Sequence, residues 1–220
     1  MNNYKISTYS ILAVILGLLV WIVVKLYFFD DRINKIGLML MEQSILNVPK
    51  QVRDVSISEG NGFALGDTSA PVKVIMFFDY DCHFCKLFFN NTFPEIESKL
   101  INTNKIRFVF RHFPIEMHPN AYLSAVMAEH ALQQGKFYDM NEKLMKTDLL
   151  NYENLVQLAL ELNVDTTEWY LNPVAIEKVD ADKSIGEKIN VRGTPTFIIN
   201  NKMYTGIRNF TEFEELITLK

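Results

Sequence analysis

The sequence predicts an α/β fold preceded by an amino-terminal membrane-spanning helix. Three observations predict it: residues 6–24 carry no formal charge, residues 72–110 have the pattern of strand, helix and strand, and helical periodicity continues from residue 121 to 189. A strand, a helix and a strand over this length form a parallel βαβ unit with a right-handed crossover.

The uncharged stretch gives 19 residues before Lys25, close to the ~20 that a helix needs to cross the hydrocarbon core of a bilayer. The flank around Lys25 has no small-residue cleavage site of the kind that ends a removable signal peptide. We therefore expect an uncleaved transmembrane anchor over residues 1–29. The lysines and arginines on its two sides do not decide its orientation.

Residues 30–64 are expected to form an amphipathic helix and a linker. Asp31 is available as N-cap, apolar residues then occupy two adjoining helical stripes as far as Val48, and Pro49 ends the pattern. Such a helix packs on its own domain, rests on a membrane surface, or holds protomers together as a homo-oligomer. Glycines at 60, 62 and 66 mark the boundary to a single domain over residues 65–220.

Within that domain the sequence predicts strands at 72–78 and 106–110, with a helix at 85–100 between them. Small residues at Ala121, Ala125 and Ala128 share one face of a helix that Gly135 ends. Further helices are expected after Asn151, after the capping pattern formed by Asp165 and Glu168, and over 174–189. A hairpin over 196–205 and a terminal helix capped by Asn209 and Glu212 complete the domain.

The charge balance excludes one large class of partners. The formal net charge is -4, from 22 Lys and Arg against 26 Asp and Glu, and the chain has no basic run. A nucleic-acid-binding surface needs clustered positive charge. A DNA- or RNA-binding function is therefore disfavoured.

Both cysteines of the chain lie in one C-x-x-C motif, Cys82-His83-Phe84-Cys85, after a predicted buried strand and at the start of a predicted helix. This spacing allows a disulfide across one helical turn, and the positive end of the helix dipole stabilises a thiolate at Cys82. A protonated His83 adds positive charge and further stabilises the thiolate, whereas the negative charges of Asp79 and Asp81 destabilise it. The motif is typical of a redox-active dithiol.

Three other roles of the cysteines are possible. A structural disulfide that closes so short a loop contributes little stability. A zinc site needs two more ligands, and the four histidines show no paired metal spacing. The cysteines could also be reduced, buried and inert. We expect no metal and no cofactor.

Residues 191–195, VRGTP, precede a predicted strand, and a tight turn with a cis Pro195 facing the dithiol explains them. Four further motifs accompany them: FFDYDCHFCK at 77–86, FRHFP at 110–114, HP at 118–119 and QGKF at 134–137. On these motifs, the chain from residue 65 to 219 resembles the DsbA-like branch of the thioredoxin superfamily. The members of that branch are exported thiol-disulfide oxidoreductases.

The resemblance implies a thioredoxin core with a helical insertion at about 118–182. It also implies that Cys82 and Cys85 form the catalytic redox pair and that Thr194 and Pro195 contact substrate. His83 and Phe84, between the cysteines, are expected to tune the redox potential. Many relatives have a histidine next to the second cysteine and a buried carboxylate six residues before the first; this sequence has Phe84 and Met76 there.

An active disulfide belongs in an oxidising compartment. The sequence therefore predicts a single-pass protein of the cytoplasmic membrane, with its catalytic domain on the periplasmic or extracytoplasmic side. Its expected partners are reduced or misoxidised exported proteins and a membrane redox partner. Two alternatives remain: a disulfide isomerase or reductase on the same scaffold, and a non-catalytic membrane-tethered adaptor or chaperone.

Overall fold

The computed structural model describes residues 52–60 and 62–218 and, nearer the amino terminus, Leu16, residues 18–22, Lys25, Phe29 and Arg32. Those amino-terminal residues have helical backbone. Among the described residues, no helix is both long enough and apolar enough to span a bilayer. Apart from Arg32, the helix expected at 31–48 lies outside the described residues. The chain divides into two units, Met1–Pro49 and Lys50–Lys220, and the second is described by itself.

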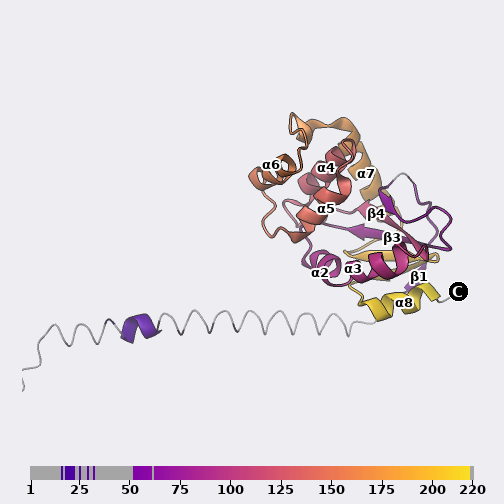
Figure 1. Ribbon diagram of the computed structural model, residues 1–220, viewed down its shortest axis with the longest axis horizontal. Coiled ribbons are helices and arrows are strands. Elements are labelled where there is room, and N and C mark those ends of the chain that lie inside the picture. Colours follow the sequence, from indigo (N-terminus) through magenta and orange to yellow (C-terminus); the bar gives the residue numbers. More distant parts are fainter. Residues whose placement is uncertain are drawn as a thin grey trace, which may run out of the picture. The chain divides into compact units, whose positions relative to one another are not determined.

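A six-stranded sheet forms the centre of this second unit, with strand order β1-β6-β5-β3-β4-β2 (Figure 1). Its strands are β1 Val52–Asp54, β2 Ala64–Leu65, β3 Val72–Phe78, β4 Ile106–His112, β5 Thr196–Ile199 and β6 Lys202–Thr205. β3 and β4 are parallel, as the βαβ pattern predicts, and the other pairs are antiparallel. Because β1 pairs with β6, the sheet begins before residue 65, the domain start expected from the sequence.

The helices form two groups (Figure 1). α2 His83–Asn91, α3 Phe93–Ile96, the π-helical turn η1 Glu97–Ile101 and α8 Phe210–Thr218 accompany the sheet. The second group lies between β4 and β5 in the chain and gathers beside the sheet. It comprises α4 Ala121–Leu132, α5 Phe137–Lys146, α6 Tyr152–Glu161, the 3₁₀ turn η2 Trp169–Leu171 and α7 Pro173–Lys188.

Alternation along β3 divides the core between the two faces of the sheet, because successive side chains of a strand point to opposite sides. Val74, Met76 and Phe78 belong to the larger apolar cluster, with residues of α2, α3, α4, α5 and α8. Ile75 and Phe77 belong to a smaller cluster on the other face, against which Ile185 and others pack. From residue 74 to 78, β3 is therefore buried on both faces, which explains why those five residues are all apolar.

Two helix caps and one cis peptide bond have the local geometry that the sequence predicts. Asn151 caps α6 by accepting from the Asn154 backbone N–H at 2.9 Å. Asn209 and Glu212 form a reciprocal capping box at the start of α8, at 2.9 and 3.1 Å. The peptide bond between Thr194 and Pro195 is cis, as expected.

One helix prediction holds in part, and another is wrong. The helix expected at 85–100 is divided at Thr92 into α2, α3 and the π-helical turn, where Pro94 has no N–H to continue the ladder. The capping pattern at 165–168 does not start an α-helix. Asp165 instead accepts from Thr167 N at 2.9 Å and Glu168 adopts a left-handed φ of 48°, so only the 3₁₀ turn η2 follows.

A buried charge pair fixes the second helical group to the sheet. Arg111 of β4 donates to the carboxylate of Asp182 in α7, which also accepts from the His112 backbone N–H at 3.2 Å. Lys178 lies 2.5 Å from the same carboxylate. Removing one partner of a buried pair leaves an uncompensated charge, so this contact resists separation of α7 from β4.

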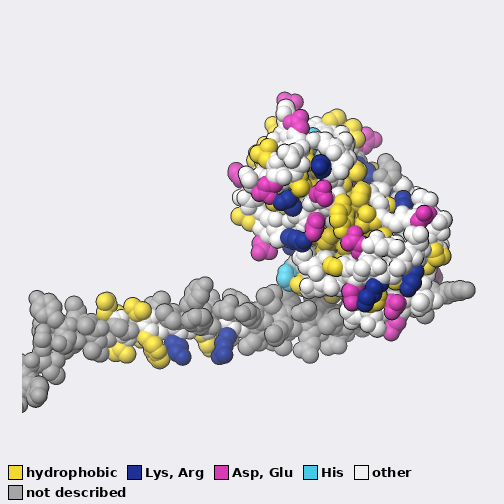
Figure 2. Space-filling view, in the orientation of Figure 1, with side chains coloured by type: hydrophobic (Ala, Val, Ile, Leu, Met, Phe, Trp, Pro, Cys, Tyr) yellow, Lys and Arg dark blue, Asp and Glu magenta, His cyan; other side chains and the backbone are white. Residues whose placement is uncertain are grey.

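The charged side chains on the face in Figure 2 are mixed in sign, with Lys and Arg interspersed among Asp and Glu. This face of the described domain carries no continuous basic patch. The mixed distribution agrees with the absence of basic runs from the sequence.

Gly186 lies where α7 meets the sheet, and a Cβ there would come within 2.5 Å of the Phe113 ring and 3.2 Å of Phe77. Gly to Ala in a helix ordinarily gains about 1 kcal/mol, but forcing an atom into a packed core costs ~1–3 kcal/mol. We predict that Gly186→Ala lowers the free energy of unfolding by about 1–2 kcal/mol in urea titrations. Gly193→Ala, whose Cβ would meet nothing within 4 Å, is the control; equal effects of the two changes would contradict the packing argument.

Candidate active site

The dithiol lies at the carboxyl end of β3, where the chain turns into α2. Cys82 occupies the N-cap position of α2 with an extended backbone, and Cys85 follows in the first turn. Cys82 is 5% exposed and Cys85 is fully buried, and both are free thiols. The two sulfurs therefore differ in access, although they are close in the chain.

The two thiols differ even more in acidity. Hydrogen bonding with the Cys85 side chain lowers the pKa of Cys82 from 9.0 to about 6; burial opposes this, and hydrogen bonds from Thr194 and the backbone N–H groups of Cys85 and Phe84 reinforce it. Burial raises the pKa of Cys85 well above its ordinary value. At neutral pH the pair therefore shares one negative charge, placed on Cys82.

The turn before β5 supplies the opposite wall of the site. The Cys82 thiol donates to the Thr194 carbonyl at 3.3 Å, next to the cis bond to Pro195. Gly193 beside them faces open space, since a Cβ there would meet nothing within 4 Å. Cys82, Cys85, Thr194 and Pro195 are thus brought together from two parts of the chain.

His83 and Phe84 lie between the cysteines in the first turn of α2. His83 is exposed and Phe84 is partly buried, and their ring centroids are 5.5 Å apart in an edge-on arrangement. Of these two residues, Phe84 interacts with Cys82: its backbone N–H donates a hydrogen bond to the Cys82 sulfur and lowers the pKa of Cys82.

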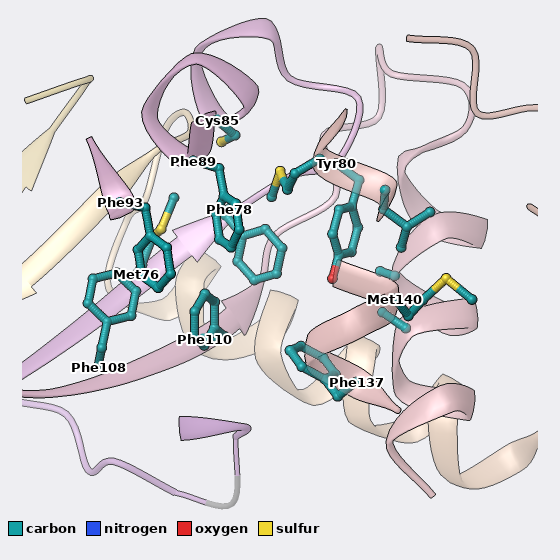
Figure 3. Packing of buried hydrophobic residues seen from close by; sticks show 14 of the residues in the cluster. Met76, Phe78, Tyr80, Cys85, Phe89, Phe93, Phe108, Phe110, Phe137 and Met140 are labelled. Carbon is teal, nitrogen blue, oxygen red and sulfur yellow. The ribbon is translucent and has the colours of Figure 1, made fainter. Parts of the chain in front are cut away.

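Cys85 lies at the edge of a group of aromatic rings (Figure 3). Phe89 and Phe93 stack at 4.5 Å, and Phe93 meets Phe108 edge-on at 5.2 Å. Met76 lies in the same group and is fully buried. These apolar neighbours explain why burial dominates the pKa of Cys85, because they offer no compensation for a charge.

Asp79 is a buried carboxylate in the turn between β3 and Cys82, and it is only 2% exposed. Its oxygens accept from the backbone N–H of Asp81 at 2.7 Å and of Ile115 at 2.8 Å, and one lies 2.8 Å from Nδ1 of His118. Burial raises the pKa of Asp79, although these three groups oppose the shift. No spacing in the sequence links Asp79 to His118, since they are 39 residues apart.

The remaining histidines have other partners. His112 Nε2 lies 2.9 Å from Glu129, and His130 contacts the Asp165 carbonyl at 2.6 Å. Within the described part of the chain, no three His, Cys, Asp or Glu side chains are grouped closely enough to hold a metal ion.

Comparison with known proteins gives matches of two kinds. The Na⁺/H⁺ antiporter NhaA 3 of Salinispora tropica is 30% identical over 149 residues, which is 66% of this chain and 22% of the antiporter. The chain thus spans less than a quarter of that relative's length. Disulfide bond formation protein D of Bacillus subtilis is 27% identical over 165 residues, covering 69% of this chain and 72% of the relative.

The fold is shared with solved structures as well. The crystal structure of α-DsbA1 from Wolbachia pipientis superimposes with a TM-score of 0.63 at 25% identity, over 74% of this chain and 91% of that one. The family model described as Thioredoxin matches residues 58–218, which include the sheet from β2 onward, the dithiol and the cis-proline turn. The chain therefore belongs to the thioredoxin family and is a DsbA-like member of it.

Proposed function

We propose that this protein is a membrane-anchored thiol-disulfide oxidoreductase that exchanges disulfides with exported proteins through Cys82 and Cys85. One observation carries the proposal: a cysteine of low pKa at a helix N-terminus, next to a buried cysteine of high pKa and facing Thr194 and Pro195. An inert or purely structural cysteine pair gives no reason for so large a difference in acidity.

The exchange begins with the disulfide form. A client thiolate attacks Sγ of Cys82, which is the less buried sulfur; the Cys82–Cys85 bond breaks, and the Cys85 sulfur leaves and takes up a proton. A second client thiolate then attacks the client sulfur of the mixed disulfide. Cys82 leaves as a thiolate, the client gains a disulfide, and the enzyme retains two electrons as a reduced pair.

The acidity difference favours this direction. Because a thiolate with a pKa of about 6 is a good leaving group at neutral pH, the second step is fast, while the protonated Cys85 is slow to reverse the first step. Lowering that pKa from 9.0 stabilises the reduced pair about tenfold at pH 7, which corresponds to about 1.4 kcal/mol or about 30 mV. This favours an oxidase over an isomerase or reductase, by a modest amount.

Return to the disulfide form requires an electron acceptor, for which we propose a redox partner in the membrane. The uncharged stretch at 6–24 supports a single-pass anchor in the cytoplasmic membrane, and oxidative chemistry supports an extracytoplasmic catalytic domain. A relative named as a Na⁺/H⁺ antiporter is consistent with a domain that works next to a membrane. The segment at 31–48 is proposed to hold protomers together.

Our first functional prediction concerns which sulfur bonds to clients. Cys85→Ser should accumulate mixed disulfides between Cys82 and exported proteins, because the thiol that releases them is gone. Non-reducing gels of whole cells followed by identification of the trapped peptides would measure this. Trapping by Cys82→Ser alone would reverse the assignment, and activity that survives Cys82→Ser would favour an adaptor or chaperone.

The second prediction concerns pH. Alkylation of the reduced protein by iodoacetamide should rise with pH to half its maximum at pH about 6, the pKa of Cys82. Since this pKa is depressed by folding, its contribution to the stability of the reduced protein is full above pH 9.0 and is lost as the pH falls through about 6. Cys85→Ala removes the largest cause and should move the midpoint upward; an unmoved midpoint would contradict that cause.

The third prediction concerns topology. The full chain should sediment with membranes and resist alkaline extraction, whereas a version without residues 1–29 should be released. After mild reduction of intact cells, a membrane-impermeant maleimide should label Cys82 without lysis. Labelling only after lysis would place the dithiol on the cytoplasmic side and end the proposal of exported clients.

A further inference from the structure

Arg208 is a charged side chain that the fold buries at a cost. It lies in the loop between β6 and α8 and is 2% exposed. Its Nη2 has no hydrogen-bond partner among the described residues. Burial lowers the pKa of Arg208, although Glu212 and Tyr204 oppose the shift. Because an incompletely paired buried charge destabilises a fold, stability alone does not explain why this position holds an arginine.

The guanidinium of Arg208 binds the backbone of the turn that follows β6. Its Nη1 donates to the Ile207 carbonyl at 2.9 Å and to the Gly206 carbonyl at 3.3 Å. Gly206 has a φ of 89°, a left-handed conformation that favours glycine. Because both carbonyls accept from one nitrogen, Arg208 fixes their directions and with them the conformation of the turn.

This turn in turn holds the cis-proline segment of the active site. The ladder between β5 and β6 ends where Thr196 lies opposite Thr205, so Pro195 and Gly206 are the first residues beyond it. The backbone N–H of Gly206 donates to the Pro195 carbonyl at 2.8 Å. The placement of the Pro195 carbonyl therefore depends on the turn as well as on strand pairing.

The residue before the proline completes the connection to the reactive sulfur. The Thr194 carbonyl accepts from the Cys82 thiol at 3.3 Å. After the Cys85 side chain, Thr194 is among the groups whose hydrogen bonds lower the pKa of Cys82. A continuous series of contacts thus joins the buried guanidinium to the sulfur that reacts.

We propose that Arg208 is a positioning residue for the dithiol, an inference that rests on the proposed function. Its guanidinium sets the turn at Gly206, the turn sets the Pro195 carbonyl, and Thr194 is thereby kept within hydrogen-bonding reach of Cys82. This role explains a buried charge at a position where an apolar side chain would avoid the desolvation cost. Loss of the guanidinium should therefore change the reactive sulfur more than the stability of the domain.

The first test is a pH profile of iodoacetamide alkylation of the reduced full-length protein. Arg208→Met removes the donors and the charge, and an apolar replacement of a buried charge is commonly compatible with folding. We predict that the midpoint of alkylation moves upward from about 6 by about half a pH unit, since weakening one hydrogen bond to a thiolate changes its pKa by this order.

Arg107→Met is the matched control for this profile. Arg107 also donates from Nη1 to the carbonyl of a left-handed glycine, Gly66, at 2.8 Å, and the φ of Gly66 is 90°. It lies near the start of β4, however, and so at the edge of the sheet opposite the dithiol. Its midpoint should equal that of the unaltered protein. Equal shifts in the two variants, or no shift in Arg208→Met, would overturn the proposal.

The second test follows the turn directly. Amide hydrogen exchange of Gly206, measured by NMR, reports the bond to the Pro195 carbonyl. In Arg208→Met this amide should exchange about tenfold faster. Arg208→Lys keeps N–H donors and a positive charge, so it should restore most of both the slow exchange and the low midpoint. A shifted midpoint with unchanged Gly206 exchange, or no recovery in Arg208→Lys, would contradict the route through the turn.

A third variant separates positioning from general destabilisation of the region. Asn209→Ala removes the cap of α8 beside Arg208, where Asn209 Oδ1 accepts from the Glu212 N–H at 2.9 Å. It should lower the melting temperature and leave the alkylation midpoint unchanged. A midpoint that follows the melting temperature across the variants, or failure of Arg208→Met to fold, would assign Arg208 to stability and overturn the proposal. An unaltered protein with the midpoint of an ordinary thiol would instead reject the proposed function.

Discussion

The antiparallel pairing of β3 with β5 is the constraint on which the site depends. In an antiparallel pair, the end of one strand lies beside the beginning of the other. With Phe77 opposite Thr196, the residues after β3 and the residues before β5 must meet at the same edge of the sheet. Cys82 and Pro195, which are far apart in the sequence, are neighbours for this reason.

The parallel pairing of β3 with β4 adds the third part of the site. Because parallel strands end at the same edge, the loop after β4 returns beside the turn after β3. The Phe113 backbone N–H bonds to the Phe78 carbonyl at 2.8 Å, and His118 then reaches Asp79. Three separate segments thus meet at the same edge of the sheet because of strand pairing.

The aromatic core makes the two cysteine thiols differ in acidity. Cys82 stands at the helix N-terminus with hydrogen-bond donors around it, whereas Cys85 lies against the apolar cluster in Figure 3. The same short motif therefore holds one thiol of low pKa and one of high pKa. The motif alone specifies the spacing, and the core beneath it supplies the difference in acidity.

Features whose signal is local could be predicted from the sequence. β3 has the predicted bounds, since only Lys73 interrupts its apolar residues, and the capping residues Asn151 and Asn209 form the expected bonds. The cis Pro195 was also predicted. The start of α5 carried no such signal, because its N-cap is Lys136 and no side chain caps it.

Features that depend on distant contacts were missed. β1 is an edge strand of three residues whose burial alternates, so it has no apolar run to recognise. The pairing of Asp79 with His118 depends on the path of the loop after β4, which no spacing encodes. Glu168 is the opposite case: its capping pattern is local, but its left-handed backbone, with a φ of 48°, prevents the helix.

The most direct test of the account is a redox titration of the purified protein in glutathione buffers, followed by mass spectrometry of its peptides. We expect one two-electron transition, in which a disulfide between Cys82 and Cys85 forms and breaks reversibly, with glutathione found transiently on Cys82. Cysteines that stay reduced across the whole range of buffers, or glutathione bound to Cys85 in place of Cys82, would contradict it.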